Sequence, residues 1–172
     1  MIAKFLTPHF TLYLPDLPGF GESSQIKDAR YTGADQVARL KEFLDTVGLE
    51  KCHIGGNSMG GYLAALYASQ FSNQVASLWL LAPAGVLSAE SSELTLLLNE
   101  GDNPLLVEDR NSYDRLIDMC FSKAPYTPGP FKRCICVESI ENRAFHAKLF
   151  DDMMSDPQAL EEASAGAPIQ TL

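Results

Sequence analysis

Apolar and polar residues follow two periods along the first half of the chain. Short runs of strand-forming or apolar residues occupy positions 11–14, 52–55 and 75–82, the length of buried strands. Between them, residues 32–48 and 59–71 carry apolar side chains three and four positions apart, which is the spacing of an amphipathic helix. Strands that alternate with helices imply parallel pairing through right-handed crossovers. The pattern predicts an α/β fold with about three parallel strands and flanking helices.

The helix predicted at 32–48 has recognisable ends. Thr32 can cap its start, and Asp35 stands three residues later, an arrangement that resembles a capping box. Gly48 ends it. A short helix tail at residues 2–6, closed by Pro8, is expected before the first strand. The apolar side chains of the longer helix fall on one face: Val37, Leu40, Phe43, Leu44 and Val47.

From residue 83 onward the pattern changes. Residues 85 to about 166 show helical segments and no convincing strand: a short apolar stretch at 94–98, a short amphipathic helix at 113–121 and a longer helix at 131–150. We therefore divide the chain into an α/β part at 1–84 and a helical part at 85–166.

The second predicted strand runs into a turn with the sequence Gly56-Asn57-Ser58-Met59-Gly60. Gly56 and Gly60 are interpreted as the positions where a Cβ would collide with passing backbone, because a strained turn lifts the Ser58 Oγ clear of the sheet. Gly61 would let the next helix lie close to the sheet. An ordinary serine-bearing turn is the alternative, but a strand before the motif and a helix after it favour a nucleophile elbow.

Catalysis by Ser58 would require two further groups. A serine needs an imidazole as general base, and it needs backbone N–H groups aimed at the developing oxyanion. The N–H of Met59 lies at the predicted helix start, where donors are free. Of the three histidines, His9 and His53 precede the elbow and His146 lies in a predicted helix. We expect none of them to serve as the base.

Two segments carry a resemblance to a known family. Residues 15–23, with the sequence PDLPGFGES, followed by the elbow at 56–61, resemble the α/β-hydrolase superfamily. Residues 77–81, 103–106 and 123–128 further resemble bacterial cold-adapted lipases of that type. The resemblance implies a carboxylic ester hydrolase that works through an acyl-enzyme, with Ser58 as nucleophile and the Met59 amide as half of an oxyanion hole.

The same resemblance makes residues 85–166 a helical cap or lid and residues 167–172 the start of the next core strand. Ordinary helical packing is the alternative for the cap. Six side chains of the cap are candidates for an acyl-binding cleft, although each is also a candidate for cap core: Phe121, Tyr126, Phe131, Phe145, Met153 and Met154.

Measured against the family pattern of serine, acid and histidine, the chain looks cut at both ends. We expect it to lack the first three strands, the acid and the catalytic histidine, and therefore to be inactive or nearly so. A partial sheet would also expose an unpaired edge. Two other functions stay open: a C–C bond hydrolase of aromatic ring-cleavage pathways, which shares the Gly-Asn-Ser-Met-Gly-Gly elbow, and a non-catalytic interaction module.

Composition narrows the partners. The formal net charge of −9 argues against nucleic acid and anionic membrane surfaces, because phosphate contacts need clustered Lys and Arg. No apolar run approaches the ~20 residues that span a bilayer. The partner expected is a small-molecule ester or lipid, with no cofactor, and the oligomeric state is left open. No signal peptide is visible. The localisation is left open, because a native start would place the chain in the cytoplasm, whereas a cut start could have removed a signal.

The four cysteines suggest no metal site. Cys134 and Cys136 flank a single residue, which suits neither zinc-finger spacing nor a C-x-x-C redox pair. Together with Cys52 and Cys120 they are predicted to be buried free thiols.

Overall fold

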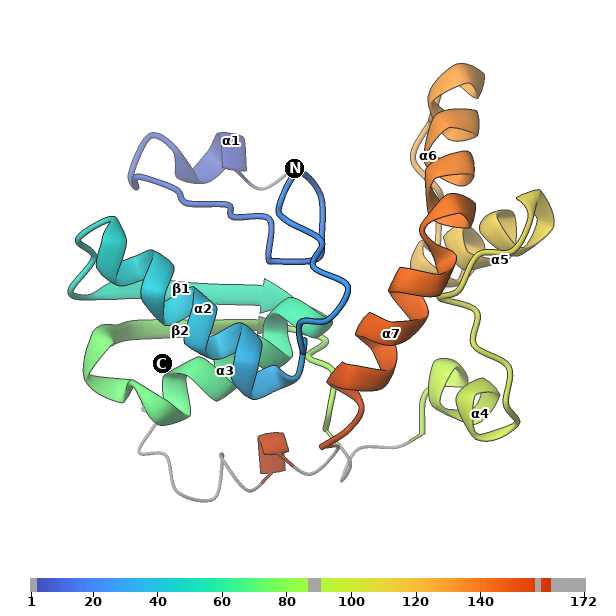
Figure 1. Ribbon diagram of the computed structural model, residues 1–172. Helices are drawn as coiled ribbons and strands as arrows, with labels where there is room; N and C mark the ends of the chain where they lie inside the picture. The colour runs from blue at the N-terminus through green and yellow to red at the C-terminus, as the bar shows by residue number, and fades with distance from the viewer. Residues whose placement is uncertain (1–2, 87–90, 157–158, 162–172) are drawn as a thin grey trace.

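The computed structural model describes residues 3–86, 91–156 and 159–161 of the 172-residue chain (Figure 1). Its sheet has two strands in these ranges, β1 (Cys52–Asn57) and β2 (Val75–Leu81). They pair in parallel, with His53 opposite Ser77 and Asn57 opposite Leu81. The predicted parallel α/β arrangement is confirmed.

The strand predicted at 11–14 is wrong. These residues adopt no regular secondary structure. The Phe10 and Tyr13 rings do contact the core, at 5.5 Å from the His53 ring and 6.2 Å from the Phe43 ring. Leu14, however, is 78% exposed. Single side chains attach this segment to the rest of the protein, and its backbone forms no strand pairing. A short apolar run in the sequence does not show whether a partner strand is present.

Helix α3 (Met59–Gln70) connects the two strands through a short 3-10 turn, η1 (Ser72–Gln74). Residues 61–68 of α3 are all buried. Helix α2 (Gly33–Thr46) packs on it, and the shared core contains Val37 and Leu44 from α2 with Leu63 and Leu66 from α3. Helix α3 is therefore the centre of the core.

The predicted ends of α2 are confirmed. The Asp35 backbone N–H donates to the Thr32 Oγ1 at 3.2 Å, and the Thr32 backbone N–H donates to the Asp35 carboxylate at 3.3 Å. This is the capping box. Gly48 follows with φ 72, the left-handed conformation that ends helices. The helix tail near the N-terminus is present as α1 (Ala3–Leu6).

The second half of the described chain is helical, with α4 (Glu93–Asn99), α5 (Arg110–Cys120), α6 (Gly129–Glu141) and α7 (Arg143–Met153). The single helix predicted at 131–150 is wrong, because α6 and α7 are separated at Asn142. The Asn142 side-chain Nδ2 donates to the Glu138 carbonyl at 3.1 Å, and such side-chain to backbone bonds compete with helix continuation. Figure 1 shows α6 and α7 as an arm that points away from the sheet. The predicted strand start at 167–172 lies outside the described residues.

Helix α7 attaches this arm to the core around Tyr31, which is 1% exposed. The Phe145 ring meets the Tyr31 ring edge-on at 5.5 Å. The Tyr31 backbone N–H donates to the Asp152 carboxylate at 2.9 Å, and the Lys148 ammonium donates to the Ala29 carbonyl and to Asp152, each at 2.6 Å. A buried ring and one carboxylate thus join the two halves of the molecule.

Candidate active site

Ser58 occupies the single position between the end of β1 and the start of α3. Its backbone has φ 51 and ψ −118, a conformation that L-residues rarely adopt and that costs on the order of 1–3 kcal/mol. Three backbone hydrogen bonds of 3.0 Å hold it there. The Ser58 N–H donates to the Leu81 carbonyl, and the Ser58 carbonyl accepts from the N–H groups of Tyr62 and Ala84. The end of β2 and the first turn of α3 therefore fix the strained turn.

The glycines of the motif have different roles. A Cβ on Gly56 would overlap the Gly60 backbone and lie 2.6 Å from the Gly61 nitrogen. A Cβ on Gly61 would lie 3.1 Å from both the Gly56 carbonyl and Pro83. A Cβ on Gly60 would meet nothing within 4 Å outside its own helix. The steric interpretation therefore holds for Gly56 and Gly61 and is wrong for Gly60, whose absent side chain would point away from the strand.

Ser58 directly precedes the N-terminal end of α3. Ser58 is exposed, and its hydroxyl makes no capping bond to the helix. Met59 is the first residue of α3, so its N–H has no acceptor within the helix, and the helix dipole favours negative charge at this end. The arrangement can present a hydroxyl nucleophile beside an amide donor.

The structure brings no histidine to Ser58 among the described residues. The His53 Nδ1 lies 2.7 Å from the Ser77 Oγ on β2. Five residue steps along extended backbone place His53 roughly 16 Å from Ser58. His146 is half-buried on α7, where burial lowers its pKa and Glu138 partly opposes that shift. His9 is exposed in the turn after α1.

The aromatic candidates for an acyl cleft are dispersed. Phe145 packs on Tyr31, and Met153 packs against the core around α3. Tyr126 and Phe131 are 92% and 66% exposed. The structure does not gather these side chains over Ser58.

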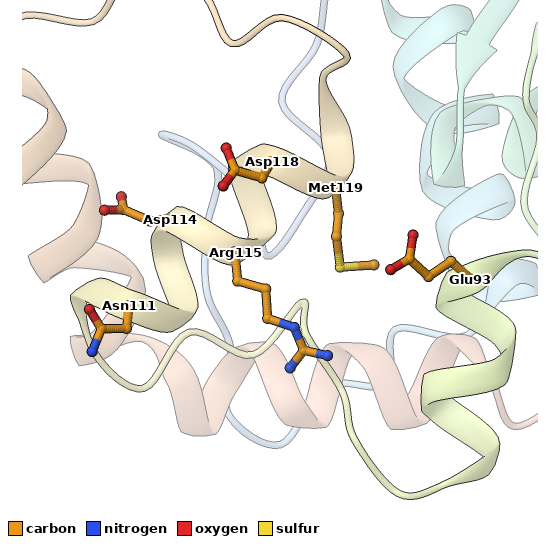
Figure 2. Close-up of a pocket in the computed structure, with 6 residues that line it drawn as sticks. All are labelled: Glu93, Asn111, Asp114, Arg115, Asp118 and Met119. Atoms are coloured by element: carbon orange, nitrogen blue, oxygen red, sulfur yellow. The ribbon is translucent and has the colours of Figure 1, made fainter.

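A cavity of about 500 Å³ lies away from the elbow, between α4 and α5. Figure 2 shows Arg115 and Met119 of α5 extending toward the side of Glu93 on α4, whereas Asp114 points the other way. Arg115 also forms an ion pair with Asp102 at 2.6 Å. Charged groups dominate this lining, unlike the mostly apolar pockets that hold small organic ligands.

The cysteine prediction is partly wrong. All four thiols are free, but Cys120 and Cys134 are exposed, Cys136 is buried, and Cys52 is half-buried with a pKa raised by burial. Cys134 and Cys136 differ because a two-residue step turns an α-helix by roughly 200°, so only Cys136 faces α5. In the described ranges, no three His, Cys, Asp or Glu side chains are grouped so as to hold a metal ion.

Sequence reasoning missed two parts of the site. Ala84 donates to the Ser58 carbonyl, and Ala82 has φ 41, so a second non-glycine residue near the elbow is strained. Alanine carries no compositional signal for either property. Only the pairing of β2 with β1 brings these residues to the elbow.

A parallel strand–helix–strand unit with a strained serine between the first strand and its helix defines a class, the proteins built around a nucleophile elbow. The chain belongs to the alpha/beta hydrolase fold family, whose model matches residues 1–115. The resemblance to the α/β-hydrolase superfamily is thereby confirmed.

Two bacterial lipases are similar to most of the chain. It is 38% identical to Lipase 1 of Psychrobacter immobilis and 36% identical to Lipase 3 of Moraxella sp. (strain TA144), covering 86% of this chain and 47% of each relative. The chain spans about half the length of the curated relatives it matches. The predicted likeness to bacterial lipases is confirmed.

Solved structures agree. A membrane phospholipase A, described as a bacterial virulence factor, superimposes with a TM-score of 0.85 at 37% identity, over 90% of this chain and 50% of that one. A meta-cleavage product hydrolase from Pseudomonas fluorescens IP01 superimposes at 0.72 with 22% identity, over 98% of this chain and 62% of that one, a likeness of fold alone.

Proposed function

We propose that the chain carries the nucleophile-bearing part of a serine hydrolase that cleaves carboxylic esters. The observation that supports this most is the backbone of Ser58, strained at the junction of β1 and α3 and held by three hydrogen bonds. Strain of this size persists only where the surrounding structure maintains it, and it gathers at functional sites.

In the proposed reaction, the Ser58 Oγ attacks the ester carbonyl carbon while its proton passes to a general base. The carbonyl π electrons move onto oxygen, and the Met59 N–H stabilises that charge. When the carbonyl re-forms, the C–O bond to the alcohol breaks and the alcohol leaves with the proton. Water then attacks the acyl-enzyme and releases the acid, restoring Ser58.

The base, the acid that orients it and the second oxyanion donor are assigned to parts of the whole protein outside the described residues. A serine hydroxyl without its base retains only a small part of its rate. Slow chemistry is therefore expected from this chain on its own.

Ester cleavage is favoured over C–C bond cleavage by the names of the relatives. Lipase 1 and Lipase 3 are 38% and 36% identical to the chain in sequence, whereas the meta-cleavage product hydrolase shares the fold at 22% identity. Assays of an active, longer form with p-nitrophenyl esters and with a vinylogous diketone would separate the two reactions. Ester turnover without diketone turnover is the expected result.

A fluorophosphonate probe tests the nucleophile directly. Prolonged labelling of the 172-residue chain, followed by peptide mass spectrometry, should place the adduct on Ser58. Ser58→Ala should abolish it, and Ser77→Ala is the matched control because Ser77 lies on β2 beside His53. An adduct on another serine, or equal labelling of Ser58→Ala, would contradict the proposal. Rapid labelling of the wild-type chain would contradict the assignment of the base to residues outside it.

A further inference from the structure

A cavity of about 230 Å³ lies between α5 and α6, away from Ser58, and we call it the α5–α6 cavity. Four of its lining residues follow the spacing of a single stripe along α6. Helix α5 contributes the remaining side. The lining consists of Arg110 and Tyr113 from α5 and of Lys132, Arg133, Cys136, Val137 and Ile140 from α6.

The inner wall of the α5–α6 cavity is apolar. Tyr113 and Cys136 are both buried and cluster with Val107. Val137 and Ile140 continue the apolar lining outward and are partly open to solvent. A hydrocarbon group that entered the cavity would therefore leave water for contact with apolar side chains.

The charged side chains that line the same cavity are all basic, namely Arg110, Lys132 and Arg133. Asp114 forms ion pairs with Arg110 at 4.0 Å and with Lys132 at 2.6 Å, so two of these cations share one carboxylate. Arg133 belongs to neither pair. Positive charge is therefore in excess at this cavity, in a chain with a formal net charge of −9.

Neighbouring acidic residues do not cancel this excess. Glu108, just before α5, forms an ion pair with Arg143. Glu138 lies on the opposite side of α6 from Arg133 and Val137, because each residue of an α-helix is turned by roughly 100° from the one before it. The carboxylate that bears directly on the lining cations is that of Asp114.

From this arrangement we propose that the α5–α6 cavity binds a small organic carboxylate with a hydrocarbon body. The carboxylate accepts hydrogen bonds from the Arg133 guanidinium, whose planar fork of N–H groups matches two carboxylate oxygens. Arg110 and Lys132 add positive charge around it. The hydrocarbon body contacts Tyr113 and Val137.

Size and polarity narrow the class of ligand. The cavity volume of about 230 Å³ is below the roughly 300–1,000 Å³ of pockets that hold drug-sized molecules, so a single ring or a short alkyl chain fits. An inorganic anion would leave the apolar wall without a partner. A neutral molecule would displace water from the cations without replacing its hydrogen bonds.

Saturation-transfer NMR titration of the 172-residue chain with phenylacetate tests the proposal. Phenylacetate should bind saturably, with a dissociation constant in the millimolar range. Phenylacetamide has the same shape without the charge, and acetate has the charge without the ring, so each should bind at least tenfold more weakly. Added salt should weaken the binding of phenylacetate more than that of phenylacetamide.

Three variants locate the binding site. Arg133→Gln should weaken phenylacetate binding about tenfold and leave phenylacetamide unchanged, because it removes a charge-assisted hydrogen bond. Val137→Trp should abolish the binding of both compounds by filling the cavity. Asp114→Asn should tighten phenylacetate binding roughly threefold, because it releases Arg110 and Lys132 from their shared carboxylate. A merely structural role of Asp114 would instead weaken binding.

Matched controls separate the cavity from general effects. Ile135→Trp introduces the same large side chain on the opposite side of α6, at a position of nearly equal exposure, 45% against 46% for Val137. Arg30→Gln removes an exposed guanidinium outside the arm. Both variants should bind phenylacetate like the wild type. Ser58→Ala should also bind normally, so a failure of the ester hydrolase proposal leaves this result unchanged.

Three outcomes would overturn the carboxylate site. One is the absence of saturable phenylacetate binding in the millimolar range. Another is equal affinity for phenylacetate and phenylacetamide, which would mean that the basic lining does not recognise the charge. The third is normal binding by Val137→Trp, with circular dichroism confirming that the variant is folded, which would place the ligand elsewhere on the chain.

Discussion

Helices α3 and α6 have nearly the same length, 12 and 13 residues, and opposite environments. Residues 61–68 of α3 are buried without interruption, whereas Cys136 is the buried residue of α6. Both helices contain apolar residues on more than one side. The difference arises because α3 lies against both strands and α2, while α6 has a packing partner on one side.

The contrast shows how each half of the molecule is held in place. Helix α3 approaches the sheet through Gly56 and Gly61, so backbone meets backbone at its first turn, and the buried residues 61–68 hold the rest of the helix. The α6–α7 arm is held by a few side chains around Tyr31 and Asp152. Rigid placement of Ser58 and a projecting arm follow from these two modes of attachment.

The strongest way to break the contrast is to prevent the close approach of α3. Gly56→Ala puts a Cβ into the Gly60 backbone and should lower the free energy of unfolding by about 3 kcal/mol. Gly60→Ala is the matched control, because its Cβ meets no neighbour outside the helix, and it should be neutral or stabilise by up to about 1 kcal/mol. Urea denaturation of both variants gives the comparison. Equal losses would show that backbone contact at Gly56 does not position α3.

A second pair of variants compares the two helices directly. Leu66→Ala on α3 removes a side chain that is 3% exposed and should cost about 2–3 kcal/mol. Ile135→Ala on α6 starts from 45% exposure and should cost less than about 0.5 kcal/mol. Thermal and urea unfolding measure both. A similar loss for Ile135→Ala would mean that α6 is covered in solution.

Alkaline pH should act on the core through Tyr67. Burial raises the pKa of Tyr67 to about 12, with smaller effects from Cys52 and Asp45, and its hydroxyl donates to Gln74 Oε1 at 2.6 Å. The unfolded tyrosine ionises near pH 10, so stability should fall from pH 10 toward pH 12, by on the order of 2 kcal/mol.

Tyr67→Phe should reduce that alkaline loss without abolishing it, since burial also raises the pKa of Tyr62, and it should forfeit about 1 kcal/mol at neutral pH with the hydrogen bond. Tyr126→Phe is the matched control, because its ring is 92% exposed. Urea unfolding across this pH range supplies the measurement. If the stability of Tyr67→Phe falls between pH 10 and pH 12 as much as that of the wild type, Tyr67 is not a group responsible for the loss.

The smallest effect is expected at the junction of the two halves. The hydrogen bond from Lys148 lowers the pKa of Asp152 below 3.8, burial opposes this, and the Tyr31 N–H adds to it. The folded carboxyl therefore ionises at lower pH than the unfolded one. Its contribution is present above about pH 3.8 and is lost as pH falls through the folded pKa.

Asp152→Asn should cost about 0.5–1 kcal/mol near neutral pH and flatten the acid limb of stability without abolishing it, since Asp35 also has a lowered pKa. Asp118→Asn, on the exposed side of α5, is the control. Calorimetry between roughly pH 2 and 7, the range in which carboxyl groups titrate, would measure the stability of the wild type and both variants. If Asp152→Asn loses as much stability at acid pH as the wild type does, Asp152 does not contribute to the pH dependence of stability.

Local signals were reliable where neighbours in sequence decide the structure. The capping box at Thr32 and the glycine stop at Gly48 were predicted because each is made within a few residues. The elbow at Ser58 was predicted for the same reason, since its glycines, strand and helix are contiguous. Prediction failed where a strand needs a partner strand from a distant part of the chain. Residues 11–14 are largely apolar, but they pair with no strand in the described structure.

Chain order and residue type were enough to establish the family, the strand–serine–helix junction and the largely helical second half, since these depend on contacts within a turn or two. The tertiary structure decided which glycine is sterically required and that α6 turns Phe131 to the outside. It also decided that Leu81, at the end of β2, and Ala84 hold Ser58 through backbone hydrogen bonds. The physical reason is that burial and hydrogen bonding between distant segments depend on which surfaces meet, and a periodicity reports only the surface a segment offers.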